Sequence, residues 1–381
     1  MLGPMSGQDT FRRELGQLLW IGFEGTALSR ELASEIAAGQ WGGVTLFRRN
    51  LVYRDGEPPV LESEPLVDLN DSLHSAIAAG EAPLLISVDQ EGGRVQRARA
   101  PAVRWPPMAA IEATGARAAE LARRIGNAVG TELDALDFDV DFAPVLDVNS
   151  NPENPIIGDR SFSADPEKAA ELALAFAEGL AAAGLVSCGK HFPGHGDTVT
   201  DSHLALPRID RDRASLEAIE LAPFRKAAEA RLPMLMTAHV IFAALDDQLP
   251  ATLSPKVVDG LLRKDIGYAG VVVSDDLDMK AVADHYGIGE AAERAILAGC
   301  DVLLLCRDRN HQLEAYENLI RAAESNSTLR DRIRESARRV HHLKRDHFRA
   351  KANRKRPGVD VLGTFQSLAD DVERAASAAS I

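Results

Sequence analysis

The sequence lacks any apolar run long enough to cross a membrane, and its first residues, MLGPMSGQDTFRRELGQLLW, show no signal-peptide pattern. Positive charge is also in short supply: 43 lysines and arginines stand against 57 aspartates and glutamates, which gives a formal net charge of −14. An excess of negative charge disfavours nucleic acid and acidic membrane surfaces as partners. We therefore expect neither a nucleic-acid partner nor a membrane partner.

Cysteine is scarce. The chain has only Cys188, Cys300 and Cys306, an odd number without the spacing of metal ligands. Each cysteine lies beside an apolar run, so we expect three buried thiols. Free thiols are typical of a reducing compartment, and this predicts a cytoplasmic location.

No G-x-G-x-x-G turn follows an early strand, which argues against a doubly wound open sheet. What the chain does contain is a series of apolar, β-rich runs that alternate with Ala-, Leu- and Glu-rich helical stretches. The runs are 18–23, 43–47, 84–88, 140–148, 185–191, 234–240, 270–276 and 302–306. Most are continuous rather than alternating, as expected of strands covered on both faces. Eight strand–helix units in a row predict an α/β fold, the (β/α)8 TIM barrel, as a single domain with extra C-terminal helices.

The domain prediction assigns residues 10–345 to the barrel and residues 346–381 to a helical or flexible C-terminal tail. A basic stretch, KRDHFRAKANRKR (344–356), crosses this boundary. We interpret the stretch as a solvated helix surface or tail rather than a binding patch. Gly184, which follows the helical pattern PEKAAELALAFAEGLAAAG, is a candidate C-cap.

In a barrel of this type, chemistry takes place at the C-terminal ends of the strands. Every predicted strand delivers polar residues there. In chain order they are Glu24, Arg48 and Arg49, the segment 89–97, Asp147, Lys190 and His191, His239, Asp275 and Asp276, and Arg307 and Asp308. Their shared position at one rim predicts an active site.

Spacing suggests roles for some of these groups but leaves alternatives open. Asp275 follows directly on a buried strand, as suits a nucleophile or a general base, yet an aspartate there can also cap the next turn. Asp276 fits the cap role equally well. Asp201 and His203 lie two residues apart, so the carboxylate can favour a protonated imidazole that acts as a general acid. A local structural hydrogen bond explains that pair as well.

A metal site is the main competing chemistry. His191 and His195 have the four-residue spacing of helical zinc ligands, but Pro193 and two glycines rule out a helix there. Barrel metallohydrolases usually carry a His-x-His pair after the first strand, where this chain has WIGFEG. We therefore expect no metal and no cofactor, and keep a metal-dependent barrel amidohydrolase as an alternative.

Four motifs together resemble a known family: VDQEGGRVQR (88–97), GDRSF (158–162), KHFPGHGDTVTDSHLALP (190–207) and VVVSDDLDM (271–279). They look like those of the glycoside hydrolase family 3 β-N-acetylglucosaminidases of bacterial cell-wall recycling. The resemblance implies Asp275 as nucleophile and His203, assisted by Asp201, as acid/base. It also implies substrate binding by Asp89, Arg97, Arg160, Lys190 and His191.

The implied activity is a retaining removal of terminal, non-reducing β-linked N-acetylglucosamine from small carbohydrates, expected to be peptidoglycan (muropeptide) fragments. A histidine acid/base leaves less negative charge in the site than a carboxylate does, so a family 3 phosphorylase that uses phosphate is an alternative. A non-catalytic sugar-binding barrel is another. The sequence departs from typical members in two places: segment 48–65 is longer and borders the barrel mouth, and the tail after about residue 350 has no counterpart among the motifs.

Overall fold

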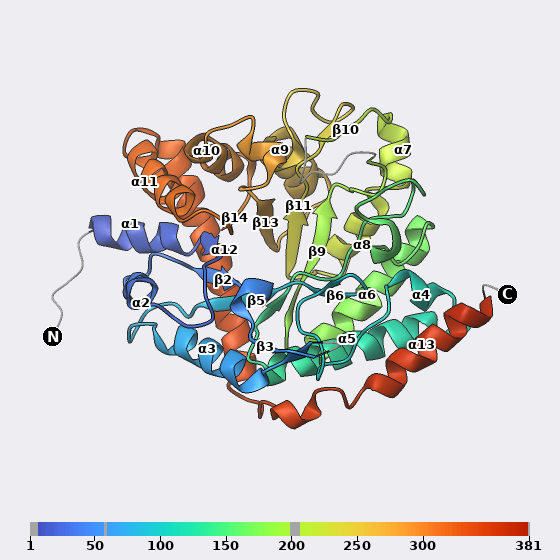
Figure 1. Cartoon of the computed structure of the whole chain (residues 1–381). Coiled ribbons are helices and arrows are strands. Elements are labelled where there is room, and N and C mark those ends of the chain that lie inside the picture. Colours follow the sequence, from blue (N-terminus) through green and yellow to red (C-terminus); the bar gives the residue numbers. More distant parts are fainter. Residues whose placement is uncertain (1–6, 57–58, 199–205, 380–381) are drawn as a thin grey trace.

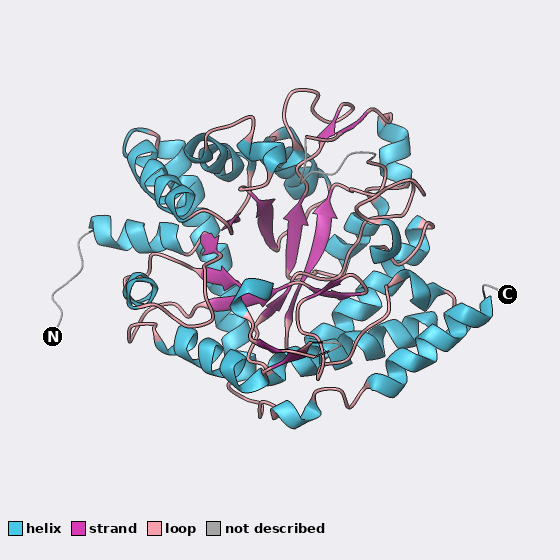
Figure 2. Ribbon diagram, viewed as in Figure 1, coloured by secondary structure: helices cyan, strands magenta, loops and turns pink. Residues whose placement is uncertain are grey.

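The fold is a closed barrel of eight parallel strands inside a ring of helices, as a computed structural model of residues 7–56, 59–198 and 206–379 shows (Figures 1 and 2). The barrel strands are β1 (Leu19–Ile21), β2 (Gly43–Thr45), β5 (Leu85–Val88), β8 (Val140–Asp141), β9 (Val186–Phe192), β11 (Met234–Thr237), β13 (Val271–Asp276) and β14 (Val302–Leu305). Each falls within or beside one of the eight predicted runs. The (β/α)8 prediction is confirmed.

A helical segment follows each barrel strand and returns the chain to the start of the next. The main helices are α1 (Gly7–Gly16), α2 (Arg30–Ala37), α3 (Ser63–Ser75), α5 (Ala118–Ala135), α6 (Pro166–Ala183), α8 (Ala222–Glu229), α10 (Ile288–Ala298), α11 (Arg309–Ser325), α12 (Ser327–Lys351) and α13 (Gln366–Ala379). The short helices are α4 (Ala109–Glu112), α7 (Arg213–Ala218) and α9 (Lys280–Ala283), and a π-helix, Lys256–Asp265, follows β11.

Local sequence explains where α6 begins and ends. The Asp165 side chain accepts a hydrogen bond from Lys168 N, and Pro166 occupies the first turn, where its missing N–H costs nothing. The helix ends at Gly184, whose φ of 88° is the left-handed conformation that favours glycine. The predicted C-cap is confirmed.

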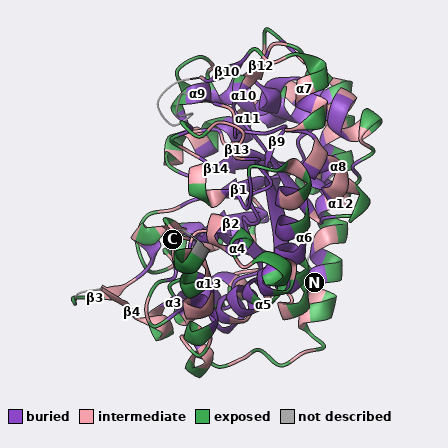
Figure 3. Ribbon diagram, turned by 90° about the vertical axis from the view of Figure 1, so that its right-hand side faces the viewer, coloured by how far each residue is buried: buried purple, intermediate pink, exposed green. Residues whose placement is uncertain are grey.

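The barrel interior is a packed apolar core. Trp20, Phe142, Met236, Val273 and Leu304 lie among its fully or almost fully buried side chains. A second, larger apolar layer lies between the strands and the surrounding helices. Figure 3 shows buried residues along the strands and on the helices around them. All three cysteines are buried and free, as predicted. No helix of the described residues is both long and apolar enough to cross a lipid bilayer.

The interpretation of the basic stretch 344–356 as a solvated surface is confirmed only in part. Arg345, Arg349, Lys355 and Arg356 are exposed, whereas the other cations of the stretch pack against the N-terminal end of the barrel, which α12 closes. Lys344 is fully buried, and its ammonium donates to Gly42 O at 2.6 Å. Lys351 pairs with Asp139 at 2.7 Å, and Arg354 pairs with Asp134 at 2.6 Å. These cations therefore pair with polar groups at the bottom of the barrel.

The segment after α12 also contacts the barrel. The buried Glu132 carboxylate on α5 accepts hydrogen bonds from Val103 N at 3.0 Å and from Gly363 N at 2.8 Å. Helix α13 then contacts α4, and Figure 1 shows it running along the lower right of the molecule. Helix α12 runs without a break through residues 345 and 346. The division of the chain into a barrel and a tail at that point stays a prediction.

Within the long segment 48–65, the short strands β3 (Tyr53–Arg54) and β4 (Val60–Leu61) pair antiparallel and project from the body of the molecule (Figure 3). This strand pair is tied to the loop that follows β5. Leu61 N donates to Ala100 O at 2.6 Å, and the Tyr53 hydroxyl donates to Arg97 O. The segment therefore borders the barrel mouth.

Candidate active site

A cavity of about 370 Å³ opens at the C-terminal end of the barrel strands. Every predicted site residue that lies within the described part of the chain lines it: Asp89, Arg97, Arg160, Lys190, His191 and Asp275. Asp201 and His203 lie outside the described residues. His239 and Glu24, which also follow strands, do not line the cavity. His239 instead contacts Thr252 and the backbone oxygen of Asp276 at 2.8 and 3.0 Å.

A hairpin after β5 carries three of the charged groups. Strands β6 (Gln90–Gly92) and β7 (Val95–Gln96) pair antiparallel. Because successive side chains on a strand point to opposite faces, Asp89, Glu91 and Arg97 reach the cavity from one face. The turn needs glycine, since Gly92 has a φ of 96° and an added Cβ would lie 2.7 Å from the Met108 methyl group.

Asp89 lies between two cations. Its carboxylate accepts from Lys190 Nζ at 2.8 Å and from Arg97 Nη2 at 3.1 Å. Burial alone would raise the pKa of Asp89, but the Lys190 and Arg97 charges hold that pKa well below its usual value. Burial opposes the charge on Lys190, yet Asp89 and Glu91 together raise the pKa of Lys190. Asp89 and Lys190 are therefore both charged when the protein meets a ligand.

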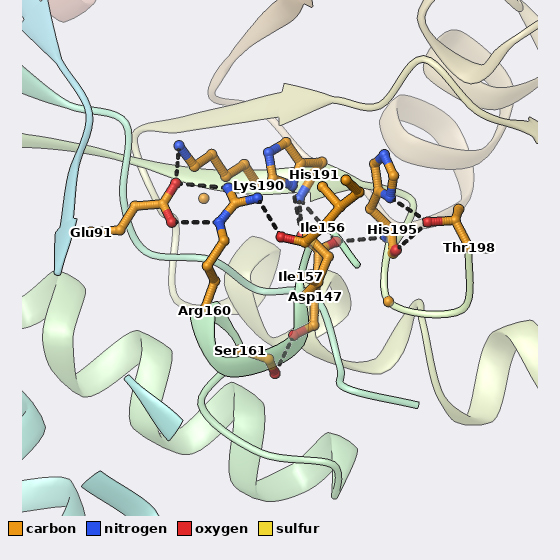
Figure 4. Close-up of polar contacts among 12 residues, drawn as sticks. Glu91, Asp147, Ile156, Ile157, Arg160, Ser161, Lys190, His191, His195 and Thr198 are labelled. Atoms are coloured by element: carbon orange, nitrogen blue, oxygen red, sulfur yellow. Dashed lines mark hydrogen bonds and ion pairs between the residues drawn. The ribbon is translucent and has the colours of Figure 1, made fainter. Parts of the chain in front are cut away.

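Glu91, which the sequence analysis did not select, completes this charge cluster. Its carboxylate forms two hydrogen bonds of 2.8 Å with Arg160 and contacts Lys190 Nζ at 2.6 Å (Figure 4). Only 2% of Glu91 is exposed. Burial raises its pKa, but Arg160 and Lys190 outweigh burial and lower it to about 2. The position of Glu91 two residues after Asp89, on the same strand face, is the signal that could have revealed it.

Replacing Glu91 with Gln is expected to lower the free energy of unfolding by about 3 kcal/mol, because two buried cations lose their shared charge partner. In the wild type this contribution is complete above pH about 4.5 and is lost as the pH falls toward about 2, since the folded-state pKa of Glu91 is depressed. Urea unfolding at several pH values measures both effects. The free energy of unfolding of the variant should fall less steeply than that of the wild type as the pH is lowered.

Glu178→Gln is the matched control, because one oxygen of the Glu178 carboxylate accepts two hydrogen bonds from Arg123, at 2.8 and 2.6 Å, on an exposed surface. Its loss should cost less than about 1 kcal/mol. Equal losses in the two variants would contradict the role given to burial.

Asp147 orients His191 from below the cavity. Its fully buried carboxylate accepts from His191 Nδ1 at 2.6 Å and from His195 N at 2.7 Å (Figure 4). Burial raises the pKa of Asp147, but His191 more than offsets this and the pKa is lowered. An ionised Asp147 keeps a hydrogen on His191 Nδ1 and fixes the direction in which Nε2 faces.

Replacing Asp147 with Asn is expected to lower kcat/KM by about 10- to 100-fold, because the amide stabilises the wrong tautomer of His191, to which the motifs assign substrate binding. This loss is smaller than that for an aspartate that orients a proton-transferring histidine. Most of the loss should fall on KM, and the pH dependence of kcat/KM should change. An unchanged pH profile with an unchanged KM would contradict the positioning role.

His195 faces the same cavity but is held differently. Its Nδ1 contacts the Thr198 hydroxyl at 2.8 Å, and burial lowers its pKa to about 4, with His191 adding to the effect. Asn154 donates to His195 O at 2.8 Å, and its side-chain oxygen accepts from Ile157 N at 2.8 Å. These bonds join the β9 loop to the loop that carries Arg160. A neutral, buried His195 serves this local structure.

The structure separates the two neighbouring aspartates of β13. Asp276 Oδ1 accepts from Asp278 N at 3.2 Å and from Cys306 N at 3.0 Å, as a turn-capping residue does. Burial, with Asp278 adding to it, raises the pKa of Asp276 to about 7. Asp275 accepts from Asp276 N at 2.8 Å and lines the cavity. Both carboxyls line the cavity, but two backbone N–H groups already occupy Asp276 Oδ1, so the contacts make Asp275 the better candidate for a nucleophile.

The residues on both sides of 199–205 are fixed to the rim. Asp197 forms two hydrogen bonds with Arg211, at 2.6 and 2.7 Å. Strand β10 (Arg208–Ile209) pairs with β12 (Ile241–Phe242), which follows β11. Across the ranges 7–56, 59–198 and 206–379, no three His, Cys, Asp or Glu side chains are grouped to hold a metal ion.

Comparisons with known proteins show which family this chain belongs to. The sequence model described as the glycosyl hydrolase family 3 N terminal domain matches residues 10–343. The chain belongs to glycosyl hydrolase family 3. It is a glycoside hydrolase, as the motifs implied. A protein named beta-hexosaminidase from Alkalilimnicola ehrlichii is 44% identical over 77% of this chain and 81% of its own length.

Two solved structures of this family are similar in fold as well. A glycoside hydrolase family 3 beta-N-acetylglucosaminidase from Paenibacillus matches with a TM-score of 0.88 at 37% identity, over 98% of this chain and 69% of that chain. NagZ from Neisseria gonorrhoeae, solved in complex with N-trifluoroacetyl-D-glucosamine, matches with a TM-score of 0.71 at 33% identity, over 94% and 98% of the two chains. A match over 98% of this chain extends well past residue 350, so most of the C-terminal segment has a counterpart in the Paenibacillus protein.

Proposed function

We propose that this glycoside hydrolase is a retaining β-N-acetylglucosaminidase that removes terminal, non-reducing β-linked N-acetylglucosamine. The observation that carries the proposal is the gathering of Asp275 with Asp89, Lys190, Arg160 and His191 in one cavity. The names of the family relatives, beta-hexosaminidase and beta-N-acetylglucosaminidase, support the choice of sugar.

In the proposed first step, the Asp275 carboxylate attacks the anomeric carbon and the bond to the leaving oxygen breaks. His203, protonated and paired with Asp201, gives its proton to that oxygen. In the second step, His203 takes a proton from water, and the water oxygen replaces Asp275 at the anomeric carbon with overall retention. Asp201 favours the charged imidazole in the first step and orients the neutral imidazole in the second.

The charged groups around the cavity bind and orient the sugar in this scheme. The ionised Asp89 accepts hydrogen bonds from sugar hydroxyls, while Lys190, Arg97, Arg160 and His191 donate them. Glu91 and Asp147 fix these donors before the substrate arrives, so little binding energy is spent on ordering side chains.

We further propose that the natural substrates are peptidoglycan (muropeptide) fragments and that the protein acts in the cytoplasm. The resemblance of the motifs to cell-wall recycling enzymes supports the first point. The three free, buried cysteines support the second.

A panel of aryl β-glycosides tests the proposed activity. The N-acetylglucosaminide should be hydrolysed with a kcat/KM far above those of the glucoside and the xyloside. Adding inorganic phosphate should leave the rate unchanged and yield no sugar 1-phosphate, which separates hydrolysis from phosphorolysis. A preferred glucoside, or release that depends on phosphate, would overturn the proposal.

A further inference from the structure

A second cavity, of about 380 Å³, lies behind the hairpin that carries Asp89 and Glu91. Arg94, Arg99 and Arg104 line it, together with the buried Gln96, and none of its lining residues is acidic. The β6–β7 hairpin separates the two cavities: Val95 and Arg97 line the catalytic cavity, whereas Arg94 and Gln96 line the second one. The two cavities therefore share one wall at the barrel mouth.

Arg94 pairs with Asp159 at 3.5 Å, but the other two arginines of this second cavity lack the carboxylate partners that many cations of the described residues have. At the bottom of the barrel, Arg263, Arg332 and Arg339 share the Asp301 carboxylate. Within the part of the chain that the structure describes, Arg99 and Arg104 have no carboxylate within ion-pair distance. Arg99 makes only a long bond of 3.5 Å to Gln96 O, and both side chains are exposed. Their hydrogen-bond donors remain available to an anion.

Buried side chains hold the backbone under these arginines in place. The Gln96 amide donates to Ala98 O at 2.9 Å and to Val103 O at 2.5 Å, and its oxygen accepts from Trp105 N at 3.2 Å. Val103 N also donates to the buried Glu132. The backbone at residues 99 and 104 is thus ordered before any ligand arrives, which lowers the entropic cost of binding.

Arg94 ties this cavity to the catalytic one. Its guanidinium donates to Ile156 O at 2.5 Å and to Ile157 O at 3.1 Å, and Ile156 also lines the catalytic cavity. Arg94 is therefore largely occupied by the loop that carries Arg160. Arg99 and Arg104 are the donors left for a ligand.

We propose that the second cavity is a subsite for carboxylate groups on the leaving group of the substrate. A guanidinium donates two parallel hydrogen bonds to a carboxylate, and two uncompensated guanidiniums in a protein of net charge −14 create a local positive field. To reach them, a leaving group must extend from the catalytic cavity past the hairpin that separates the two cavities. The proposal rests on the proposed function and adds that the preferred leaving group is anionic.

The test compares matched substrates. One is N-acetylglucosaminyl-muramic acid with a short peptide that carries free carboxylates, and the other is the same compound with every carboxylate amidated. The wild type should hydrolyse the free acid with a kcat/KM about tenfold higher than that of the amidated compound, mostly because KM is lower. Two exposed charge pairs together give a factor of this size. R99Q/R104Q should abolish this preference, and added salt should weaken it in the wild type.

Two controls isolate the effect. R321Q/R338Q removes the same charge from exposed positions on α11 and α12 and should keep the preference. The neutral aryl N-acetylglucosaminide should be hydrolysed by wild type and R99Q/R104Q at rates within about twofold, as expected when only a remote leaving-group contact is lost. A wild type that failed to hydrolyse the neutral aryl N-acetylglucosaminide would refute the proposed function rather than the subsite.

Two results would overturn the subsite. One is a wild type that shows no preference for the free acid. The other is an R99Q/R104Q variant that retains the preference. If millimolar inorganic phosphate altered hydrolysis of the neutral aryl substrate in the wild type but not in R99Q/R104Q, the cavity would bind a free anion instead of the leaving group.

Discussion

Replacing Asp275 with Asn is expected to lower kcat for an aryl N-acetylglucosaminide by at least about 10⁴-fold, the scale of losing a nucleophile. The amide cannot form the glycosyl-enzyme, so neither step of the proposed mechanism proceeds. The substrate should still bind, because Asp89, Lys190 and Arg160 remain in place. Steady-state kinetics and binding of N-acetylglucosamine to the variant measure the two effects separately.

Asp276→Asn is the matched control for this variant, one residue further along β13. The Asn side-chain oxygen can still accept from Asp278 N and Cys306 N, so the turn after the strand is preserved. The change removes a carboxyl that lines the same cavity, and kcat should fall by less than about tenfold, as for a group outside the reacting atoms. A reversed order of the two variants would assign the nucleophile to Asp276.

Replacing His203 with Ala is expected to slow substrates with poor leaving groups by about 10²- to 10⁴-fold, because the leaving oxygen departs without a proton. A nitrophenolate leaving group needs no such proton, so formation of the glycosyl-enzyme should be much less affected with that substrate. Its hydrolysis should still be slow, since the same histidine activates water in the second step.

Pre-steady-state kinetics separate these two roles. With the nitrophenyl substrate, the His203→Ala variant should show a burst of product equal to the enzyme concentration, followed by slow turnover. Equal slowing of the first step for good and poor leaving groups would contradict the acid role.

The barrel could be predicted from the sequence because its strands are buried on both faces and so appear as continuous apolar runs. The fourth run was predicted too long. The strand β8 ends at Asp141, and Pro144, which has no N–H to donate to a neighbouring strand, lies three residues further on. Beyond Asp141 the run still bonds to β9, from Cys188 N to Ala143 O and from Leu146 N to Lys190 O, but the pairing is no longer a regular ladder. Apolar character marks a buried segment, whereas a strand also requires regular pairing.

The charged contacts were harder to predict because they join residues far apart in the chain. Glu91 pairs with Arg160, 69 residues away, and Lys351 pairs with Asp139, 212 residues away. A local charge pattern cannot reveal such partners, which is why the buried basic residues of α12 resembled a solvated surface. Asp147 appeared at a strand end in the sequence, but only the folded chain shows its carboxylate against His191.

The most direct test of the central claim is mass spectrometry of the His203→Ala protein during turnover of the nitrophenyl N-acetylglucosaminide. The account predicts that the intact protein gains the mass of one N-acetylglucosaminyl group, and that this group lies on the peptide fragment ion containing Asp275. Protein of unchanged mass, or a sugar attached at Asp276, would contradict a double displacement through Asp275.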